Sequence, residues 1–500
     1  MHNPLDTYLK KHGVTQQYIV SDIGDIWLSD SGNICPPDIK NSSPPDKPHN
    51  SPSDIKNSSP PDKPHNSPSD KPHNSPSDKP YNSPPDIKNS SPPDKPHNSP
   101  PDIKNSSPSD KPHISPPGLG NISRKKAQEH LRGTIAVVIP LYDEFDYITA
   151  TMDSLLQSFE SCNRNYPVWI LCVVNNKKED SEKVRENNCR TITYLKKLQR
   201  HITERRLLCN SQALSLTLID CSSAGYEIPS DMGVGYARKI GMDFALEQGA
   251  EILACLDGDT LVEKSYISCL QECATVVVNS RGAKTIRAWV TDFSHQKSES
   301  PEETEAIKIY EHYLKEHSEQ LKLCKTPYYS VALGPTIVCS RDAYISCGGM
   351  NTKNAGEDFY FLQSLTKILG TAPGILHTTV HPSCRISLRV PFGTGRAVKK
   401  ICEGERTIKE FTVYPHWIYD AIKKFIEVME EYCKTPLSGS LLENELKKTQ
   451  EGIYPFLERE KFFSAWDKLL ANNKKTEQLQ RAFHCWFDGL KIIRLIHFLE

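Results

Sequence analysis

Residues 251–262, EILACLDGDTLV, join an apolar run to two carboxylates. The run from Ile252 to Leu256 is rich in strand-forming residues, and it ends at Asp257 and Asp259, which one glycine separates. In open α/β sheets, ligands bind beyond the carboxyl ends of the strands. Two hard oxygen ligands at such a position suit Mg²⁺ or Mn²⁺, which also bind phosphate oxygens. The stretch therefore predicts a buried strand that presents a metal and diphosphate site, and an ordinary acidic turn is the alternative.

Three further apolar runs precede this stretch, and segments with helical periodicity separate them. The runs cover residues 134–140, 168–174 and 214–220, and the helical segments include 145–159 and 233–246. Continuous apolar runs, in place of apolar and polar alternation, are typical of parallel strands that helices cover on both faces. The sequence therefore predicts the α/β class with a doubly wound, mostly parallel sheet. Amphipathic periodicity beyond about residue 401 predicts a C-terminal helical region over residues 401–500.

A tandem repeat occupies residues 38–117, where ten octapeptides such as DIKNSSPP and DKPHNSPS follow one another. Each unit has at most one apolar side chain, so the tract cannot bury enough surface to offset its ordering entropy. We expect a disordered linker, with an interaction arm as the alternative. Residues 1–37 form a short N-terminal segment whose apolar patch, residues 18–27, would dock on the main domain as a small helix or strand.

Composition narrows the possible partners. The net charge is −1, which argues against a general binder of nucleic acid or anionic membranes. The 16 cysteines include no CxxC pair, which favours a reducing compartment over a disulfide framework. No run approaches the roughly 20 apolar residues of a membrane span. We therefore expect a cytoplasmic protein without a membrane span, which recognises its partners at a site.

The turn after the first run, residues 140–144, reads PLYDE. Acidic and aromatic groups at the carboxyl end of a strand are placed to bracket a nucleotide base, which makes Pro140, Tyr142 and Glu144 candidates for donor binding. In the alternative interpretation, Pro140 ends the strand and Asp143 caps the following helix.

Glycines flank a basic pair in residues 233–241, GVGYARKIG. The spacing does not fit a dinucleotide-binding fingerprint, because the glycines follow a loop and no acidic residue lies at the required distance. Arg238 and Lys239 remain at a helix entrance, where they could approach a pyrophosphate. A basic pair on the surface is the alternative.

Two acids, Glu357 and Asp358, follow Gly356 at the start of another predicted helix. Acids in the first turn complement the helix dipole, but they could also face the cleft beside Asp257 and supply a general base.

The segment from Ser383 to Arg396, SCRISLRVPFGTGR, alternates basic or polar with apolar residues before a glycine-rich turn. This pattern predicts a strand with one basic face that clamps phosphate or sugar hydroxyls, or a lid over the donor, with Arg389 and Arg396 as candidate contacts. His381, just before it, is either a third metal ligand or a structural histidine.

The order of these motifs resembles the family 2 glycosyltransferases of the GT-A fold. The resemblance covers roughly residues 134–397, in the order VVIPLYDE, a strand ending at Asn175, GxARKxG, DGD after a strand, and GGM with GED. It implies a nucleotide-sugar-dependent transferase domain over residues 124–400.

The resemblance also implies roles for individual residues. The metal motif of the family falls on Asp257 and Asp259, and its general base falls on Asp358 with Glu357 as companion. Its pocket for the donor base falls on Pro140, Tyr142 and Glu144, and its arginine falls on Arg238. The implied reaction transfers one sugar from a nucleotide sugar, with a UDP-sugar favoured, to a hydroxyl of a glycan, a lipid-linked or a small-molecule acceptor.

The implied mechanism uses Mn²⁺ or Mg²⁺ to neutralise the leaving diphosphate, helped by Arg238 and by Arg389 or Arg396. Asp358 takes the acceptor proton, with inversion at the anomeric carbon.

Two departures from the family stand out. Asn175 and Asn176 occupy a position where many relatives have aspartate, so Asn175 is expected to make a weaker donor contact. The QxxRW signature of processive synthases is missing as well, which favours a single transfer. A retaining GT-A transferase that makes a small glycosylated solute and a non-catalytic nucleotide-sugar-binding scaffold remain as alternatives.

Overall fold

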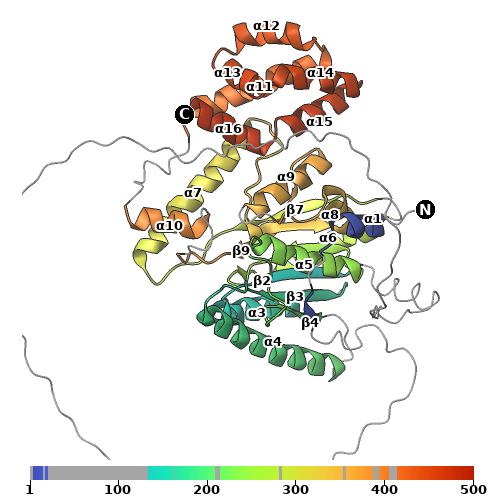
Figure 1. Ribbon diagram of the computed structural model, residues 1–500, viewed down its shortest axis with the longest axis vertical. Coiled ribbons are helices and arrows are strands. Elements are labelled where there is room, and N and C mark those ends of the chain that lie inside the picture. Colours follow the sequence, from blue (N-terminus) through green and yellow to red (C-terminus); the bar gives the residue numbers. More distant parts are fainter. Residues whose placement is uncertain are drawn as a thin grey trace, which may run out of the picture. The chain divides into compact units, whose positions relative to one another are not determined.

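The computed structural model describes residues 4–14, 17–20, 133–163, 165–208, 214–280, 284–352, 356–386, 393–404 and 414–500. These residues belong to one compact unit (Figure 1). The predicted linker over residues 38–117 and the candidate contact Arg389 lie outside the described residues.

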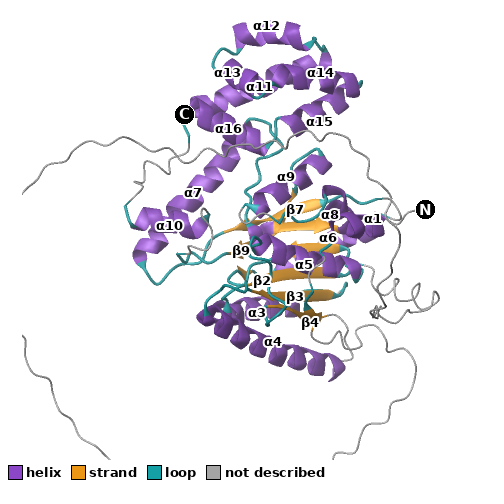
Figure 2. Cartoon of the chain, viewed as in Figure 1, coloured by secondary structure: helices purple, strands orange, loops and turns teal. Residues whose placement is uncertain are grey.

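A nine-stranded sheet runs through this unit, and Figure 2 shows it between helices. The strands lie in the order β1-β4-β3-β2-β5-β8-β7-β9-β6. Their bounds are β1 Ile19–Val20, β2 Ile135–Leu141, β3 Val168–Asn175, β4 Leu214–Cys221, β5 Ile252–Cys255, β6 Leu261–Val262, β7 Ala288–Phe293, β8 Ile337–Ser340 and β9 Gly374–His381.

The four strands predicted from apolar runs form the parallel part of this sheet. β4, β3, β2 and β5 are neighbours and pair in parallel. Three of them begin at the predicted residue, and β2 begins one residue later than predicted. Every residue of β2 and β3 is buried, as continuous apolar runs predict. The other half of the sheet is mixed, because β7 and β9 pair in parallel whereas β5–β8, β7–β8 and β6–β9 are antiparallel.

Helices cover both faces of the sheet. The helices of the sheet region are α1 Pro4–His12, α3 Phe145–Glu160, α4 Glu182–Leu208, α5 Val234–Glu247, α6 Tyr266–Asn279, α7 Pro301–Leu323, α8 Arg341–Cys347, α9 Glu357–Leu369 and α10 Thr394–Cys402. In β2, Val137 and Ile139 share a core with α3 and α6, whereas Ala136 and Val138 share one with α5, α8 and α9. A Cβ on Gly241 of α5 would lie 2.5 Å from Val138 Cγ1, so this glycine lets the helix lie close to the sheet. The α/β class with helices on both faces is confirmed.

The segment before the repeat belongs to this unit. β1 pairs antiparallel with β4, which gives part of the predicted apolar patch a place as a strand. In α1, the Tyr8 hydroxyl donates to Asp243 Oδ1 at 2.8 Å, and Lys239 Nζ lies 2.9 Å from Asp243 Oδ2. Lys239 is therefore buried in an ion pair, and its interpretation as half of a surface basic pair is wrong.

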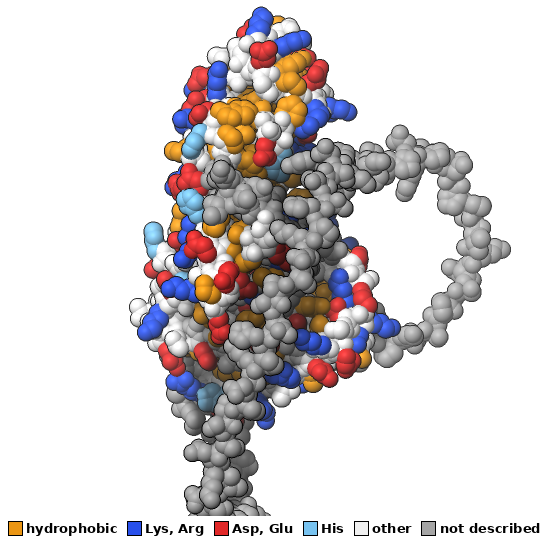
Figure 3. All heavy atoms as spheres, turned by 90° about the vertical axis from the view of Figure 1, so that its left-hand side faces the viewer, with side chains coloured by type: hydrophobic (Ala, Val, Ile, Leu, Met, Phe, Trp, Pro, Cys, Tyr) orange, Lys and Arg blue, Asp and Glu red, His pale blue; other side chains and the backbone are white. Residues whose placement is uncertain are grey.

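The C-terminal region is helical, as predicted, and forms a bundle with its own core. Its helices are α11 His416–Lys434, α12 Gly439–Thr449, α13 Tyr454–Arg459, α14 Phe462–Asn472, α15 Thr476–Trp486 and α16 Gly489–Leu499. Phe425, Phe462 and Phe487 are fully buried among these helices. On the face shown in Figure 3, hydrophobic side chains gather over the bundle, whereas basic and acidic side chains are interspersed elsewhere.

Polar contacts join the bundle to the sheet region. Lys367 Nζ of α9 lies 2.5 Å from Asp488 Oδ2, and the Tyr328 hydroxyl donates to the carbonyl oxygen of His484 at 2.9 Å. Leu321 and Cys324, at the end of α7, pack into the bundle core. Among the described helices, none is both long and apolar enough to cross a bilayer.

The strand predicted from Ser383 onward is absent from the part of its segment that the structure describes. The alternating segment that starts at Ser383 does not form a strand over its described part, since residues 382–386 are irregular and the glycine-rich turn opens α10. Alternation gives a strand only where a neighbouring strand supplies hydrogen bonds, and β9 has already ended at His381.

Candidate active site

A cavity of about 1170 Å³ opens at the carboxyl ends of β2, β3 and β5 and reaches the start of α9. This position agrees with the general rule for ligand sites in α/β sheets. Most of the site residues predicted from sequence line it, namely Pro140, Tyr142, Glu144, Asn175, Arg238, Asp257, Asp259, Glu357 and Asp358. We call the part of the wall formed by these residues and Arg385 the charged half.

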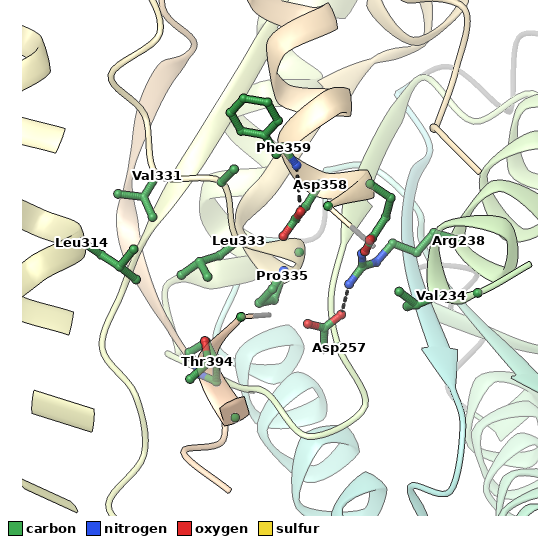
Figure 4. A pocket seen from close by; sticks show the side chains of 18 of the residues that line it. Val234, Arg238, Asp257, Leu314, Val331, Leu333, Pro335, Asp358, Phe359 and Thr394 are labelled. Atoms are coloured by element: carbon green, nitrogen blue, oxygen red, sulfur yellow. Dashed lines mark hydrogen bonds and ion pairs between the residues drawn. The ribbon is translucent and has the colours of Figure 1, made fainter. Parts of the chain in front are cut away.

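Arg238 lies buried between two carboxylates of the charged half. Its Nη1 lies 2.5 Å from Glu357 Oε1, and its Nη2 forms an ion pair with Asp257 Oδ1. Figure 4 shows the Arg238 side chain reaching from α5 toward Asp257. Burial alone would lower the pKa of Arg238, but the two carboxylates outweigh it and raise the pKa. Arg238 therefore holds the first aspartate of the DGD motif and the first acid of α9 in fixed positions.

The glycines around Arg238 serve close packing. A Cβ on Gly235 would lie 2.7 Å from Glu357 Cβ, and a Cβ on Gly334 would clash with the Arg238 guanidinium. The GVGYARKIG motif thus brings α5 against α9, and its predicted role as an open entrance for a pyrophosphate does not match this packing. Arg238 still lines the cavity, but only 4% of its side chain is exposed.

Arg385 pairs with the second aspartate of the motif. Its Nη2 lies 2.9 Å from Asp259 Oδ2 and 2.5 Å from Glu144 Oε1, and its guanidinium stacks over the Tyr147 ring at 4.2 Å. Glu144, a predicted donor contact, is therefore an ion-pair partner. Arg385 lies in the predicted basic segment, but Arg389 and Arg396 were the predicted contacts, because alternation alone does not tell which arginine reaches the cavity.

Two asparagines of α4 hold the turn that follows β2. The backbone N–H groups of Asp143 and Phe145 donate to Asn188 Oδ1 at 3.1 Å and to Asn187 Oδ1 at 3.0 Å. These bonds stabilise Asp143 at φ 57°, a conformation rare outside glycine. Neither asparagine was predicted to be functional, although two adjacent poor helix formers inside a helix were a usable signal.

Asn175 supports the same turn. Its side-chain amide donates to the carbonyl oxygen of Leu141 at 3.1 Å, and its backbone carbonyl oxygen accepts from Asn188 Nδ2. Asn175 lines the cavity, yet its side chain is buried and its amide group donates to backbone carbonyl oxygens of β2 and β3.

Asp358 has an environment suited to proton transfer. Burial and the neighbouring Glu357 raise its pKa to about 7, although Arg238 and the backbone N–H of Phe359 act in the opposite direction. That N–H donates to Asp358 Oδ1 at 2.7 Å, which orients the carboxylate. Figure 4 shows the Asp358 and Asp257 carboxylates directed into the same space. A carboxylate with a pKa near neutrality can accept a proton at physiological pH.

Two predicted contacts lie away from the cavity lining. His381 Nδ1 lies 2.8 Å from the carbonyl oxygen of Ser294, which agrees with the structural histidine left open by the sequence. Within the described residues no three His, Cys, Asp or Glu side chains cluster to hold a metal, and His381 is not among the residues that line the cavity with Asp257 and Asp259. Arg396 is exposed on α10 and is not part of the described lining.

Asp257 and Asp259 nonetheless fit a hard divalent cation. Both carboxylates line the cavity, and 30% of the Asp257 side chain and 17% of the Asp259 side chain are exposed. Mg²⁺ and Mn²⁺ are commonly held by one or two carboxylates, with water and phosphate oxygens completing the shell.

Comparisons with known proteins give weak matches. No family model matches the sequence, and no curated protein matches it. Staphylococcus aureus TarS 1-349 in complex with UDP-GlcNAc matches with a TM-score of 0.28 and 10% identity, over 71% of this chain and 91% of that chain. The mannosyltransferase PcManGT from Pyrobaculum calidifontis, in complex with GDP-Man and Mn²⁺, matches with a TM-score of 0.29 and 13% identity, over 70% of this chain and 86% of that chain. With TM-scores this low, fold and function rest on the sheet order and on the side chains described above.

Proposed function

We propose that the protein is a glycosyltransferase that moves one sugar from a nucleotide-diphosphate sugar to an acceptor hydroxyl, with inversion at the anomeric carbon. The observation that supports this most strongly is the meeting of Asp257, Asp259 and Asp358 around one cavity. The first two follow β5 and the third opens α9, about a hundred residues later. Such an arrangement provides a place for a leaving diphosphate beside a base for the acceptor.

In this proposal the charged half binds the donor. Asp257 and Asp259 would hold Mn²⁺ or Mg²⁺, which when bound neutralises charge that develops on the leaving group. Arg238 orients Asp257, and Arg385 adds a cation at the wall beside Asp259. Pro140 and Tyr142 line the cavity at the end of β2, where we propose that the nucleotide base lies. Arg389, in the same basic segment as Arg385, is also proposed to contact the donor.

Asp358 is the proposed general base. Its raised pKa matches the requirement that a base be deprotonated near neutral pH and still hold the proton it accepts. A base that removes the acceptor proton during direct attack gives inversion. Glu357 supports this role by raising the pKa of Asp358 while its own carboxylate stays paired with Arg238. We propose residues 124–400 as the catalytic domain, residues 38–117 as a linker and residues 401–500 as a helical region beside the site.

The test is donor turnover by the full chain. UDP-glucose, UDP-GlcNAc and GDP-mannose are each incubated with the protein and Mn²⁺, and donor binding and release of the nucleoside diphosphate are measured. We expect one donor to bind and to be turned over. Binding of a donor without release favours the scaffold, no binding of any nucleotide sugar contradicts the proposal, and NMR of the product anomer separates inversion from retention.

A further inference from the structure

The other half of the cavity wall has a different chemistry. Between Asp358 and the C-terminal bundle, the described lining consists of aromatic, aliphatic and small residues. We call this the neutral half, and it comprises Tyr310, Tyr313, Leu314, His317, Ser318, Leu321, Tyr328, Tyr329, Ser330, Val331, Ala332, Leu333, Gly334, Pro335, Phe359, Tyr414, Gly489, Ile493, Ile496 and His497. This set contains no Asp, Glu, Lys or Arg.

A row of rings runs along one face of α7 in the neutral half. Tyr310, Tyr313 and His317 are spaced three and four residues apart, which puts them on the same side of a helix. Tyr310 and Tyr313 stack with ring centroids 6.4 Å apart, and Tyr313 and His317 stack at 6.1 Å with an interplanar angle of 7°. Tyr414 packs against Tyr313 and His317 edge to face, with ring centroids 6.4 and 5.9 Å apart. The result is an aromatic wall that suits an apolar ligand.

His317, the histidine in this row, is neutral at physiological pH. His317 Nδ1 lies 2.7 Å from the Tyr419 hydroxyl, and burial lowers the pKa of His317 to about 4. At physiological pH this half therefore presents no charge from His317 to a ligand. A phosphate or carboxylate on the ligand would find no Lys or Arg side chain in this set to offset the cost of leaving water.

The neutral half is continuous with the proposed base. Phe359 follows Asp358 at the start of α9, and Figure 4 shows Leu314, Leu333 and Pro335 across the open space from the Asp358 carboxylate. Burial, and to a smaller extent Tyr313 and Asp358, raise the pKa of Tyr310, and the contribution of Asp358 agrees with the closeness of these two side chains. A molecule seated on the α7 rings can therefore bring a hydroxyl to Asp358.

We propose that the neutral half binds the acceptor and selects an uncharged molecule with an apolar ring body that carries the reacting hydroxyl. This inference rests on the proposed function, because it identifies Asp358 as the destination of that hydroxyl. A free oligosaccharide fits less well, because polar groups of this half already have partners within the protein: Ser318 Oγ and the Tyr328 hydroxyl donate to the backbone carbonyl oxygens of Tyr329 and His484. Ile493, Ile496 and His497 come from α16, so the C-terminal bundle completes the acceptor site.

The test uses three probes on the full chain with Mn²⁺ and the donor found above. 2-Naphthol is an uncharged ring with a hydroxyl, 2-naphthyl phosphate is its charged counterpart, and maltotriose is a polar saccharide. Binding is measured by calorimetry and transfer by mass spectrometry. We expect 2-naphthol to bind at least about tenfold more tightly than the other two and to be glycosylated. Equal or tighter binding of maltotriose or of the phosphate overturns the inference.

Two variants locate the binding. Tyr313→Ala removes a ring from the centre of the row and is expected to weaken 2-naphthol binding about tenfold. Leu314→Lys adds a charge to the same half and is expected to weaken it by a similar factor or more. Tyr432→Ala, a half-buried bundle residue outside the lining, is the control and should change the affinity less than twofold. Unchanged binding in both cavity variants contradicts the inference.

Donor measurements keep the two proposals separate. Tyr313→Ala and Leu314→Lys should bind the nucleotide sugar like the unmodified chain, because donor binding is assigned to the charged half. Donor turnover without 2-naphthol binding overturns only the acceptor inference. Absence of donor binding overturns the proposed function itself.

Discussion

The charged half and the neutral half of one cavity are built from different parts of the chain and hold their side chains by different forces. The charged half comes from strand ends and helix starts of the sheet, and two arginines pair there with four carboxylates, namely Arg238 with Asp257 and Glu357, and Arg385 with Asp259 and Glu144. The neutral half comes from α7, from the segment before β8 and from the bundle, where aromatic stacking and apolar packing prevail.

The difference between the two halves fits two separate roles, donor binding in the charged half and acceptor binding in the neutral half. Paired ions in a site shielded from water keep fixed positions, which suits the stabilisation of charge on a leaving group. Aromatic and aliphatic side chains without charge recognise shape and apolar area, which suits selection of an acceptor. Asp358 lies where the two halves meet, and its raised pKa reflects both burial and the neighbouring Glu357. The predictions that follow test whether the charged half behaves as a preorganised donor site.

The largest expected effect on folding is that of Arg238→Met. It leaves Asp257 and Glu357 without their shared cation, and removing one partner of a buried ion pair typically costs about 3–5 kcal/mol. Urea unfolding measures the loss. Arg396→Met, on the exposed side of α10, is the matched control and should stay within about 0.5 kcal/mol of the unmodified chain. A loss below about 1 kcal/mol in Arg238→Met would mean that this pairing does not organise the charged half.

Asp257→Asn should weaken the response to metal. It removes one of two hard oxygen ligands, and we expect Mn²⁺ affinity in the presence of the nucleoside diphosphate to fall about 10- to 100-fold. Titration of the thermal midpoint with Mn²⁺ measures this change, because a ligand that binds only the native state raises it. The exposed Asp231→Asn is the control. An unchanged Mn²⁺ titration in Asp257→Asn rules out the DGD motif as the metal site.

The transfer rate should depend on pH through Asp358. A general base works only when deprotonated, so with a pKa of about 7 the rate should fall about tenfold per pH unit well below that value and level off above it. Initial rates at saturating donor between pH 5 and 9 check this. A rate that is flat down to pH 5 would contradict the assignment of the raised pKa to the base.

The smallest expected effect is that of Arg396. Because its side chain is exposed on α10 and outside the described lining, Arg396→Met should change donor affinity less than twofold. Calorimetry with the donor measures this. A tenfold loss would restore the contact predicted from the sequence.

The sequence predicted the parallel core well because strands covered on both faces carry a continuous apolar signal. β2 and β3 are buried at every position, and their bounds differ from the predicted ones by at most one residue at either end. The same topology predicted that the polar residues at the ends of β2 and β5 lie close together, because parallel strands point their carboxyl ends toward one edge of the sheet. These parts depend on local pattern and on one general rule.

The pairing inside the site was not predictable, because it depends on tertiary contacts between distant segments. Arg238 meets Glu357, 119 positions away, and Arg385 meets Glu144, 241 positions away. No local pattern indicates that Arg385 rather than Arg389 or Arg396 pairs with the DGD motif. The neutral half was missed for the same reason, since α7 and α16 each appear only as amphipathic helices in the sequence.

The central claim is tested most directly by Asp358→Asn, measured for donor affinity, transfer rate and stability together. We predict donor affinity within about threefold of the unmodified chain and a transfer rate at least about 100-fold lower at pH 8.

The stability of the Asp358→Asn variant should not be lower than that of the unmodified chain. A carboxylate whose pKa is raised in the folded state contributes stability below its unfolded pKa and loses that contribution as the pH rises through about 7. At pH 8 the neutral asparagine should therefore leave the thermal midpoint equal or higher. Full transfer rate in Asp358→Asn with the donor still bound would contradict the account.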